Sequence, residues 1–365
     1  MQDLKKIVIT GGPCAGKTTA MGWIKNALEP MGYTVLFVPE TATELICGGV
    51  APWTCGTSLE YQICQMQLQI AKEEIFSKAA KTMPAEKILI VCDRGMLDNK
   101  AYMQQDDFEK ALYAINSDEV TLRDNYDAVF HLVTAAKGAQ KFYTTAGNNA
   151  RTETLQEAAA LDDKLISAWT GHPHLRIIGN DGSFEDKMKA LVAEMSSFLG
   201  EPEPLEIERK FLIEYPDINL LESSEFCNKV DIEQTYLENA AGERFRLRRR
   251  GINGNYIYYH TYKEKISDIK RIEIEKRISK SEYDEFLSNT KSQKHTISKT
   301  RYCLVYENQY FEIDVYPFWK DKAIMEIELC DENCKVNLPD CINVIKEVSD
   351  DDAFSNFSLA KNYGK

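Results

Sequence analysis

The chain has 365 residues, a formal net charge of −13 and the composition of a soluble globular protein. This length predicts roughly two domains, and the acidic balance argues against a general nucleic-acid-binding surface. No window approaches the ~18 continuous apolar residues of a membrane span, and the start lacks a signal-peptide pattern. The 10 cysteines show no paired CxxC spacing, which favours free thiols in a reducing, cytoplasmic compartment over disulfides or zinc.

The first predicted element is a short buried strand, Ile7 to Thr10, which runs into a glycine-rich turn and a helix. The turn fits the pattern G-x-x-x-x-G-K-[ST] in the strand-loop-helix context that this pattern needs. Its glycines let backbone N–H groups close around phosphate oxygens at a helix N-terminus. Lys17 is expected to reach the β- and γ-phosphates of ATP or GTP, and the Thr18 hydroxyl to bind Mg²⁺. The predicted nucleotide-binding residues here are Gly11, Gly12, Pro13, Cys14, Ala15, Gly16, Lys17, Thr18 and Thr19.

The next two predicted strands each end in a carboxylate. One strand ends in Glu40, and the other, after a helical pattern over 58–82, ends in Asp93. The carboxyl ends of strands form the ligand-binding edge of an α/β sheet, although Glu40 could simply cap the following helix. Asp93 occupies the place of the second magnesium-coordinating carboxylate of P-loop proteins. We predict that Glu40 and Asp93 are catalytic and that Asp93 is also a metal ligand.

The remaining pattern of this half also alternates strands and helices, with strands over 127–133 and 175–180. His131 lies within an apolar run, as a core histidine usually does. Arg151 opens a helix that continues to about Trp169, where it is either a nucleotide-binding lid arginine or part of a surface ion pair. The repeated alternation predicts an α/β P-loop domain over 1–199, with a parallel sheet flanked by helices.

Three segments of this half carry a family resemblance: GGPCAGKTT, VPETAT with Glu40, and CDRGMLD with Asp93, Arg94 and Asp98. Together they resemble the P-loop group that contains nicotinamide-riboside-kinase-type and deoxynucleoside-kinase-like proteins and AAA-type NTPases. The resemblance implies that Glu40 is a base or a metal contact and that Arg94 assists phosphate binding. No Asn-Lys-x-Asp motif for guanine is present, so the choice between ATP and GTP stays open.

A short acidic, proline-containing linker is predicted over 200–204, and the pattern changes there from a period of 3.6 to a period of two. In the strand that follows, over 205–211, alternate side chains point to opposite faces. Glu206, Glu208 and Lys210 share one face. Such a row could bind a metal ion beside a phosphate group, or it could be an ordinary solvated face.

The same alternation returns in the later segments 244–250, 261–263, 271–275, 299–301, 312–316 and 326–328. Like charges spaced by two would repel one another on a bare face. They are compatible if phosphate anions lie beside the arginines and divalent cations lie among the carboxylates. The helix expected over 279–289 and the segment 339–348 are predicted to cover the outer apolar faces.

The ordered set E-x-E-x-K, R-x-R-x-R, T-x-K, R-x-E-x-E, K-x-R, E-x-D-x-Y and E-x-E resembles the CYTH superfamily, the triphosphate tunnel metalloenzymes, over 205–365. The resemblance implies an α+β domain built on an antiparallel eight-stranded β tunnel with its charges inside. It also implies that triphosphates are bound by Lys210, Arg244, Arg246, Arg248, Lys263, Arg271, Lys299 and Arg301. The implied ligands of Mg²⁺ or Mn²⁺ are Glu206, Glu208, Glu273, Glu275, Glu312, Asp314, Glu326 and Glu328.

These patterns lead to two functional hypotheses. The first is a triphosphate hydrolase with Glu206, Glu208 and Lys210 as catalytic residues, fused to an ATP- or GTP-binding domain that could phosphorylate a small molecule. The second follows from the domain pairing, which resembles the group of proteins similar to TRPL translocation defect protein. That resemblance implies a binding or trafficking module for GTP and phosphoinositide headgroups. A third, weaker hypothesis is a nucleoside-type kinase whose tunnel senses polyphosphate.

Overall fold

The computed structural model describes residues 2–142, 154–201, 207–238, 244–265, 271–289, 294–331 and 333–364. Glu206 and Arg151, two of the predicted site residues, lie outside these ranges. The chain forms two compact units, Met1–Glu203 and Pro204–Lys365. Each unit has its own buried apolar clusters, so each is described by itself.

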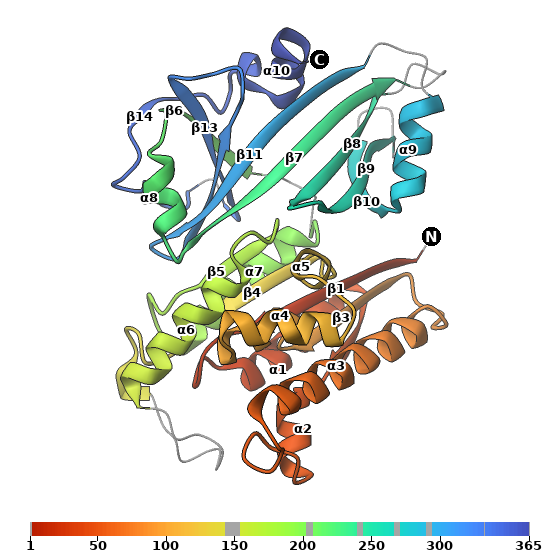
Figure 1. Ribbon diagram of the computed structural model, residues 1–365, viewed down its shortest axis with the longest axis vertical. Helices are drawn as coiled ribbons and strands as arrows, with labels where there is room; N and C mark the ends of the chain where they lie inside the picture. The colour runs from red at the N-terminus through yellow and green to blue at the C-terminus, as the bar shows by residue number, and fades with distance from the viewer. Residues whose placement is uncertain are drawn as a thin grey trace. The chain divides into compact units, whose positions relative to one another are not determined.

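The N-terminal unit is a five-stranded parallel sheet flanked by helices, as predicted (Figure 1). Its strand order is β2-β3-β1-β4-β5, which brings the carboxyl ends of β2, β3 and β1 together at one edge. The strands are β1 (Asp3–Thr10), β2 (Tyr33–Val38), β3 (Lys87–Asp93), β4 (Ala128–Leu132) and β5 (Leu175–Ile178). The helices are α1 (Lys17–Leu28), α2 (Thr41–Cys47), α3 (Ser58–Ala80), α4 (Gln105–Ala114), α5 (Glu119–Arg123), α6 (Leu155–Trp169) and α7 (Phe184–Phe198), with 3-10 segments η1 (Glu29–Met31), η2 (Met96–Tyr102) and η3 (Gln140–Phe142).

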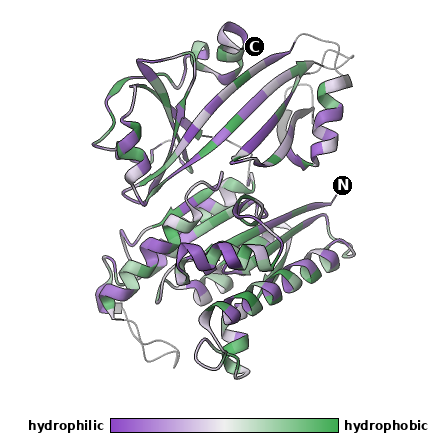
Figure 2. Ribbon diagram, in the orientation of Figure 1, coloured by the Kyte–Doolittle hydropathy of each residue, from purple (hydrophilic) through white to green (hydrophobic). Residues whose placement is uncertain are grey.

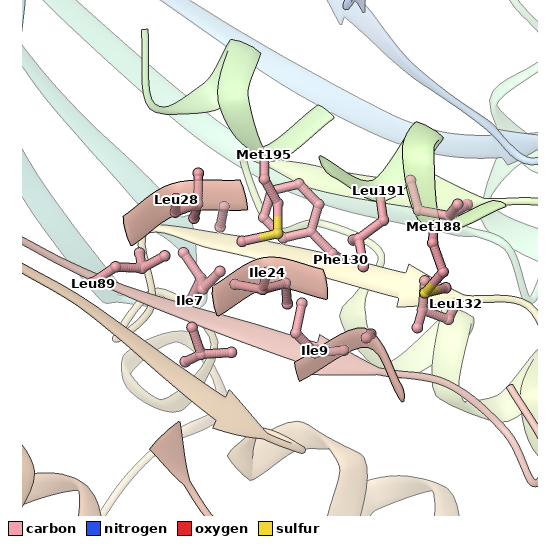
Figure 3. Close-up of a cluster of buried hydrophobic side chains, with 14 of the residues drawn as sticks. Ile7, Ile9, Ile24, Leu28, Leu89, Phe130, Leu132, Met188, Leu191 and Met195 are labelled. Atoms are coloured by element: carbon pink, nitrogen blue, oxygen red, sulfur yellow. The ribbon is translucent and has the colours of Figure 1, made fainter. Parts of the chain in front are cut away.

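Helices α1 and α7 cover one face of this sheet and bury its central strands. Figure 3 shows Ile24 of α1 and Leu191 of α7 beside Ile9 of β1 and Phe130 of β4. Because both faces of a parallel sheet are covered, β1 and β3 end in nearly continuous apolar runs. This packing holds the loops at the carboxyl ends of the strands on a rigid base.

The C-terminal unit is an antiparallel sheet of nine strands in the order β10-β9-β8-β7-β11-β12-β13-β6-β14. The predicted antiparallel domain is confirmed, but it has nine strands in place of eight because the segment 344–347, expected only as a cover, pairs with β6. The strands are β6 (Ile207–Glu214), β7 (Cys227–Glu238), β8 (Arg244–Ile252), β9 (Asn255–Lys265), β10 (Arg271–Ile278), β11 (His295–Tyr306), β12 (Gln309–Val315), β13 (Lys322–Leu329) and β14 (Val344–Glu347). The helices are α8 (Ile218–Ser223), α9 (Lys280–Asn289) and α10 (Asn356–Tyr363), with the 3-10 segment η4 (Asp352–Phe354).

The strand register gives this sheet one charged face and one apolar face. Figure 2 shows polar and apolar residues alternating along β7 and β11. On the apolar face, Phe211 lies opposite Met325, and both are buried. Arg209, which breaks the alternation of β6, pairs with Glu347 of β14, with 2.7 Å between Nη2 and Oε2. Charged residues with described side chains on this face are Glu208, Lys210, Arg246, Arg248, Arg250, Glu275, Lys299, Arg301, Glu312, Asp314, Glu326 and Glu328.

Helix α9 covers part of the apolar face, where Tyr283 is buried against Leu237 and Leu247. Among the described residues, none of the helices combines the length and the apolar character that crossing a membrane requires.

Candidate functional site

The glycine-rich turn between β1 and α1 has the backbone shape that its sequence requires. Gly11 has a φ of 142°, and a Cβ atom there would lie 2.1 Å from the Leu132 carbonyl oxygen, so only glycine fits. Lys17 is the first residue of α1, and its Nζ donates to the carbonyl oxygens of Gly11 and Gly12 at 2.7 and 3.2 Å. Burial, together with the charge of Arg94, lowers the pKa of Lys17 to about 8. The lysine thus lies folded back over the turn that is predicted to hold phosphate.

Glu40, Asp93 and Arg94 meet at the carboxyl edge of the parallel sheet. Arg94 Nε donates to Glu40 Oε1 at 2.5 Å. Burial opposes ionisation of Glu40, but the positive charge of Arg94 outweighs it and lowers the pKa of Glu40 to about 2. Burial raises the pKa of Asp93, whose Oδ1 is buried without a hydrogen-bond partner among the described residues. An unpartnered carboxylate oxygen beside Thr18 on the lining of one cavity suits a Mg²⁺ ion.

The segment after β3 is held in a strained shape. Arg94 has a φ of 71°, a left-handed conformation that non-glycine residues adopt mainly at functional sites. Gly95 follows, and a Cβ atom there would lie 2.5 Å from the Trp169 ring. Asp98 accepts hydrogen bonds from Thr10 Oγ1 at 2.8 Å and from Trp169 Nε1 at 2.6 Å. These contacts fix the arginine in position.

Asp162 of α6 is a buried residue that the sequence analysis missed. Its Oδ1 accepts from the backbone N–H of Gly12 at 2.9 Å and lies 3.0 Å from Nε2 of His131, and its Oδ2 lies 3.0 Å from Lys137 Nζ. Burial opposes its ionisation, but His131 and Lys137 lower the pKa of Asp162. The sequence pattern could have indicated this residue, because Asp162 is an acidic residue on the apolar side of its helix. Ala158, Leu165 and Ile166 are buried on the same helix. His131 therefore has a structural partner in the core, as expected.

A cavity of about 1040 Å³ extends from the glycine-rich turn to α2 and α3. Its lining includes ten of the predicted site residues of this half, namely Pro13, Cys14, Ala15, Gly16, Lys17, Thr18, Thr19, Glu40, Asp93 and Arg94. It also includes Tyr61, Gln62, Gln65, Asn99 and Tyr102, none of which the sequence analysis named.

One end of the charged face in the C-terminal unit is a dense network of ion pairs. Arg301 binds Asp314 through two hydrogen bonds of 2.7 Å each, and its Nη2 donates to Glu326 at 3.0 Å. It also bonds to Glu312. Burial opposes ionisation of Asp314, but Arg301 and Lys299 lower its pKa to about 2. Asp314 is therefore ionised, and its charge is neutralised by Arg301 and Lys299.

Lys210 belongs to the same network. Its Nζ lies 3.0 Å from Glu326 and 3.7 Å from Glu208. Burial opposes protonation, but these carboxylates raise the pKa of Lys210, so the lysine stays charged. A charged lysine binds phosphate and does not accept a proton.

The other end of the charged face, on β8, is rich in arginine. Arg246 and Arg248 both donate to Glu275, at 3.2 and 2.5 Å. Arg250 lies two residues further along the same face and is buried. Burial and the neighbouring arginines lower the pKa of Arg248, with Glu275 opposing, and its Nε has no hydrogen-bond partner among the described residues. This arginine row can accept an anion.

No group of three or more His, Cys, Asp or Glu side chains in the described parts of the chain forms a ready metal site. The strand register nevertheless sets Glu208 directly opposite Glu328, and Glu312 directly opposite Glu326. Like charges across a strand pair are unfavourable unless a cation separates them. Arg301 lies between Glu312 and Glu326 and bonds to both. A divalent cation is suited to the pair formed by Glu208 and Glu328. The structure describes only the backbone of Arg244, Lys263, Arg271 and Glu273.

Comparisons with known proteins agree with the two units. The family model described as "AAA domain" matches residues 6–187, and the model described as "CYTH domain" matches residues 204–335. A crystal structure of "the inorganic triphosphatase NE1496" is 26% identical, with a TM-score of 0.31, and the match covers 44% of this chain and 97% of that one. Thymidylate kinase from Candida albicans is 16% identical, with a TM-score of 0.40, and the match covers 53% and 91%.

Both TM-scores are below 0.5. The comparison with curated proteins found no match.

Proposed function

We infer that this protein, which joins an N-terminal AAA-type P-loop domain to a C-terminal CYTH domain, hydrolyses a triphosphate on the charged face of its CYTH domain. The observation that carries this proposal is the arginine row of β8, where Arg248 is half-buried and its Nε has no hydrogen-bond partner among the described residues. Arginine donors in a fixed fork suit the oxygens of a phosphate chain. A triphosphate is long enough to lie along several of these donors at once.

The acidic end of the same face fits a divalent cation. We propose that Glu208, Glu328 and Glu326 hold Mg²⁺ or Mn²⁺ together with Glu206, with Glu312 and Asp314 supporting them at this end and Glu273 and Glu275 of β10 assisting from the arginine-rich end. When bound, such an ion would activate a water molecule and screen the phosphate charge. Lys210, Lys299 and Arg301 lie on the same face and would orient the phosphate chain against it. Positioning and charge stabilisation supply most of the rate of phosphoryl transfer. We therefore propose that the positive charges of Lys210, Lys299 and Arg301 are the main contribution of the chain to catalysis.

The P-loop domain is proposed to bind ATP or GTP with Mg²⁺. The backbone N–H groups of residues 14–19 and the side chain of Lys17 would bind the phosphates, and Thr18 and Asp93 would hold the ion. Glu40 keeps Arg94 directed toward the cavity, which supports a role for Arg94 in phosphate binding. We also propose a cytoplasmic location, because cysteines that form no disulfide bonds fit a reducing compartment.

A phosphate-release assay on inorganic triphosphate, ATP, GTP and thiamine triphosphate, with Mg²⁺ or Mn²⁺, tests the proposal. The double substitution Glu206→Ala with Glu208→Ala is expected to abolish release, and Lys17→Ala to preserve release while removing nucleotide binding. The opposite result would indicate that hydrolysis takes place in the P-loop domain. No release from any of the four substrates, together with binding to phosphoinositide headgroups, would favour a binding or trafficking module over an enzyme.

A further inference from the structure

The C-terminal helix α10 lies against the charged side of the CYTH sheet. Leu359 of α10 is 1% exposed and packs in one buried cluster with Ile297 of β11 and Leu212 of β6. Ile297 is two residues from Lys299 along its strand, and Leu212 is two residues from Lys210. Side chains two residues apart on a strand project from the same face. Helix α10 therefore covers part of the face that carries the proposed phosphate-binding residues.

The first residue of α10, Asn356, contacts a lysine of this face directly. Its Oδ1 accepts hydrogen bonds from Lys299 Nζ and from the Tyr316 hydroxyl, each at 3.0 Å. Both donor residues are buried. The Ser355 hydroxyl caps the helix by accepting from the backbone N–H of Ser358 at 3.2 Å, which fixes the residue at which the helix begins. The start of the helix thus holds the Asn356 side chain against Lys299.

Lys299 donates to one charged acceptor and one neutral acceptor. Its Nζ bonds to Asp314 as well as to Asn356. An ammonium group carries three hydrogens, so one of them has no partner among the residues that the structure describes. Asp314 also accepts two hydrogen bonds from Arg301, so its single charge is divided between two cations. The neutral oxygen of Asn356 fixes the direction of the ammonium group without cancelling any of its charge.

We propose that Asn356 is a positioning residue for triphosphate hydrolysis, which orients Lys299 so that its remaining ammonium hydrogen points to a phosphate oxygen of the substrate. This inference rests on the function proposed for the CYTH domain. The role requires a neutral side chain, since a carboxylate at the same place would pair with Lys299 and repel the phosphate. Asn356 lies beyond residues 204–335, the segment that matches the CYTH family model, so the site extends into α10.

The test uses the full-length chain and measures phosphate release from inorganic triphosphate, ATP, GTP and thiamine triphosphate with Mg²⁺ or Mn²⁺. Asn356→Asp keeps the shape and the acceptor oxygen but adds a negative charge. Asn356→Leu keeps the approximate size and removes the acceptor. Asn362→Asp is the matched control, because Asn362 is an exposed residue of the same helix. The midpoint of urea unfolding shows whether each variant keeps its fold.

The KM is compared for the substrate that the unsubstituted protein hydrolyses best. Asn356→Asp is expected to raise this KM by about 10- to 100-fold, the usual value of hydrogen bonds to charged groups. Its unfolding midpoint should be unchanged, because both hydrogen bonds to Oδ1 are retained. Asn356→Leu should raise KM about tenfold and also lower the midpoint, because two buried donors lose their acceptor. Asn362→Asp should change KM by less than about twofold.

A purely structural role for Asn356 predicts a different result, because Asn356→Asp would then keep both its hydrogen bonds and its activity. An unchanged KM in either Asn356 variant, or an equal rise in Asn362→Asp, overturns the inference alone. A fall in kcat without a rise in KM also overturns it, since loss of folded protein has the same effect. Absence of phosphate release by the unsubstituted protein from all four substrates overturns the function proposed for the CYTH domain and this inference with it.

Discussion

A single carboxylate, Asp162, connects the phosphate-binding turn to the core of the P-loop domain. It holds the Gly12 N–H and lies against His131 and Lys137 while fully buried. Asp162→Asn keeps the volume but removes the charge, and its amide nitrogen cannot accept from Lys137 as Oδ2 does. We expect a loss of about 1–3 kcal/mol of unfolding free energy and weaker binding of ATP or GTP. Urea denaturation and calorimetry would measure both effects.

The control for this substitution is Asp163→Asn, since Asp163 is 41% exposed and pairs with Lys137 at 2.6 Å. The pH dependence gives a second readout. Because the folded-state pKa of Asp162 lies below its unfolded value of about 4, its stabilisation is present above that pH and is lost as pH falls through the lower, folded value. The unsubstituted protein should therefore lose more stability below pH ~4 than Asp162→Asn does. Equal losses in both proteins would show that the carboxylate is not stabilised by its partners.

At the scale of one element, strand β8 carries the arginines proposed to bind phosphate on one face and an arginine held in an ion pair on the other. Arg248 faces the charged side beside Arg246, whereas Arg249 points to the opposite face and pairs with Glu233 at 3.1 Å. We expect Arg248→Ala to raise the KM for triphosphate by about 10- to 100-fold, the usual value of hydrogen bonds to charged groups. The adjacent Arg249→Ala should change KM by less than about twofold, because exposed ion pairs contribute little. Steady-state phosphate release would measure both, and equal effects would contradict the assignment of faces.

At the scale of the whole molecule, the two units have separate cores, and each carries its own proposed phosphate site. The described carboxylates Asp314 and Glu326 are already paired with Arg301, so we expect the CYTH domain to fold without a bound metal ion. Removal of metal with EDTA should therefore reduce triphosphate hydrolysis to background without lowering the midpoint of urea unfolding. Added Mg²⁺ or Mn²⁺ should restore hydrolysis. A large fall in the unfolding midpoint would instead indicate that a metal ion holds the fold together.

Several features of the protein follow from its sequence alone, because they depend on local periodicity and on short motifs. The apolar run before Gly11 and the helix after Lys17 predict a strand, a turn and a helix in that order. The period of two after residue 207 predicts strands with one charged face, and the register agrees for every described side chain of the predicted set. Such patterns are readable because the chain neighbours of a residue determine which face it occupies.

The tertiary structure decided which of these charges meet, because ion pairs between distant segments depend on strand order and register. Arg301 with Glu326, Arg94 with Glu40, and Asp162 with Gly12 join parts of the chain that lie from 25 to 150 residues apart. The ninth strand was also decided at this level, since four residues carry no clear period and pair only because β6 offers a free edge. The burial of Tyr61 and Gln62 in the cavity lining without hydrogen-bond partners among the described residues was also decided by the tertiary structure. Their spacing is that of an ordinary helix, and only burial without a partner distinguishes them.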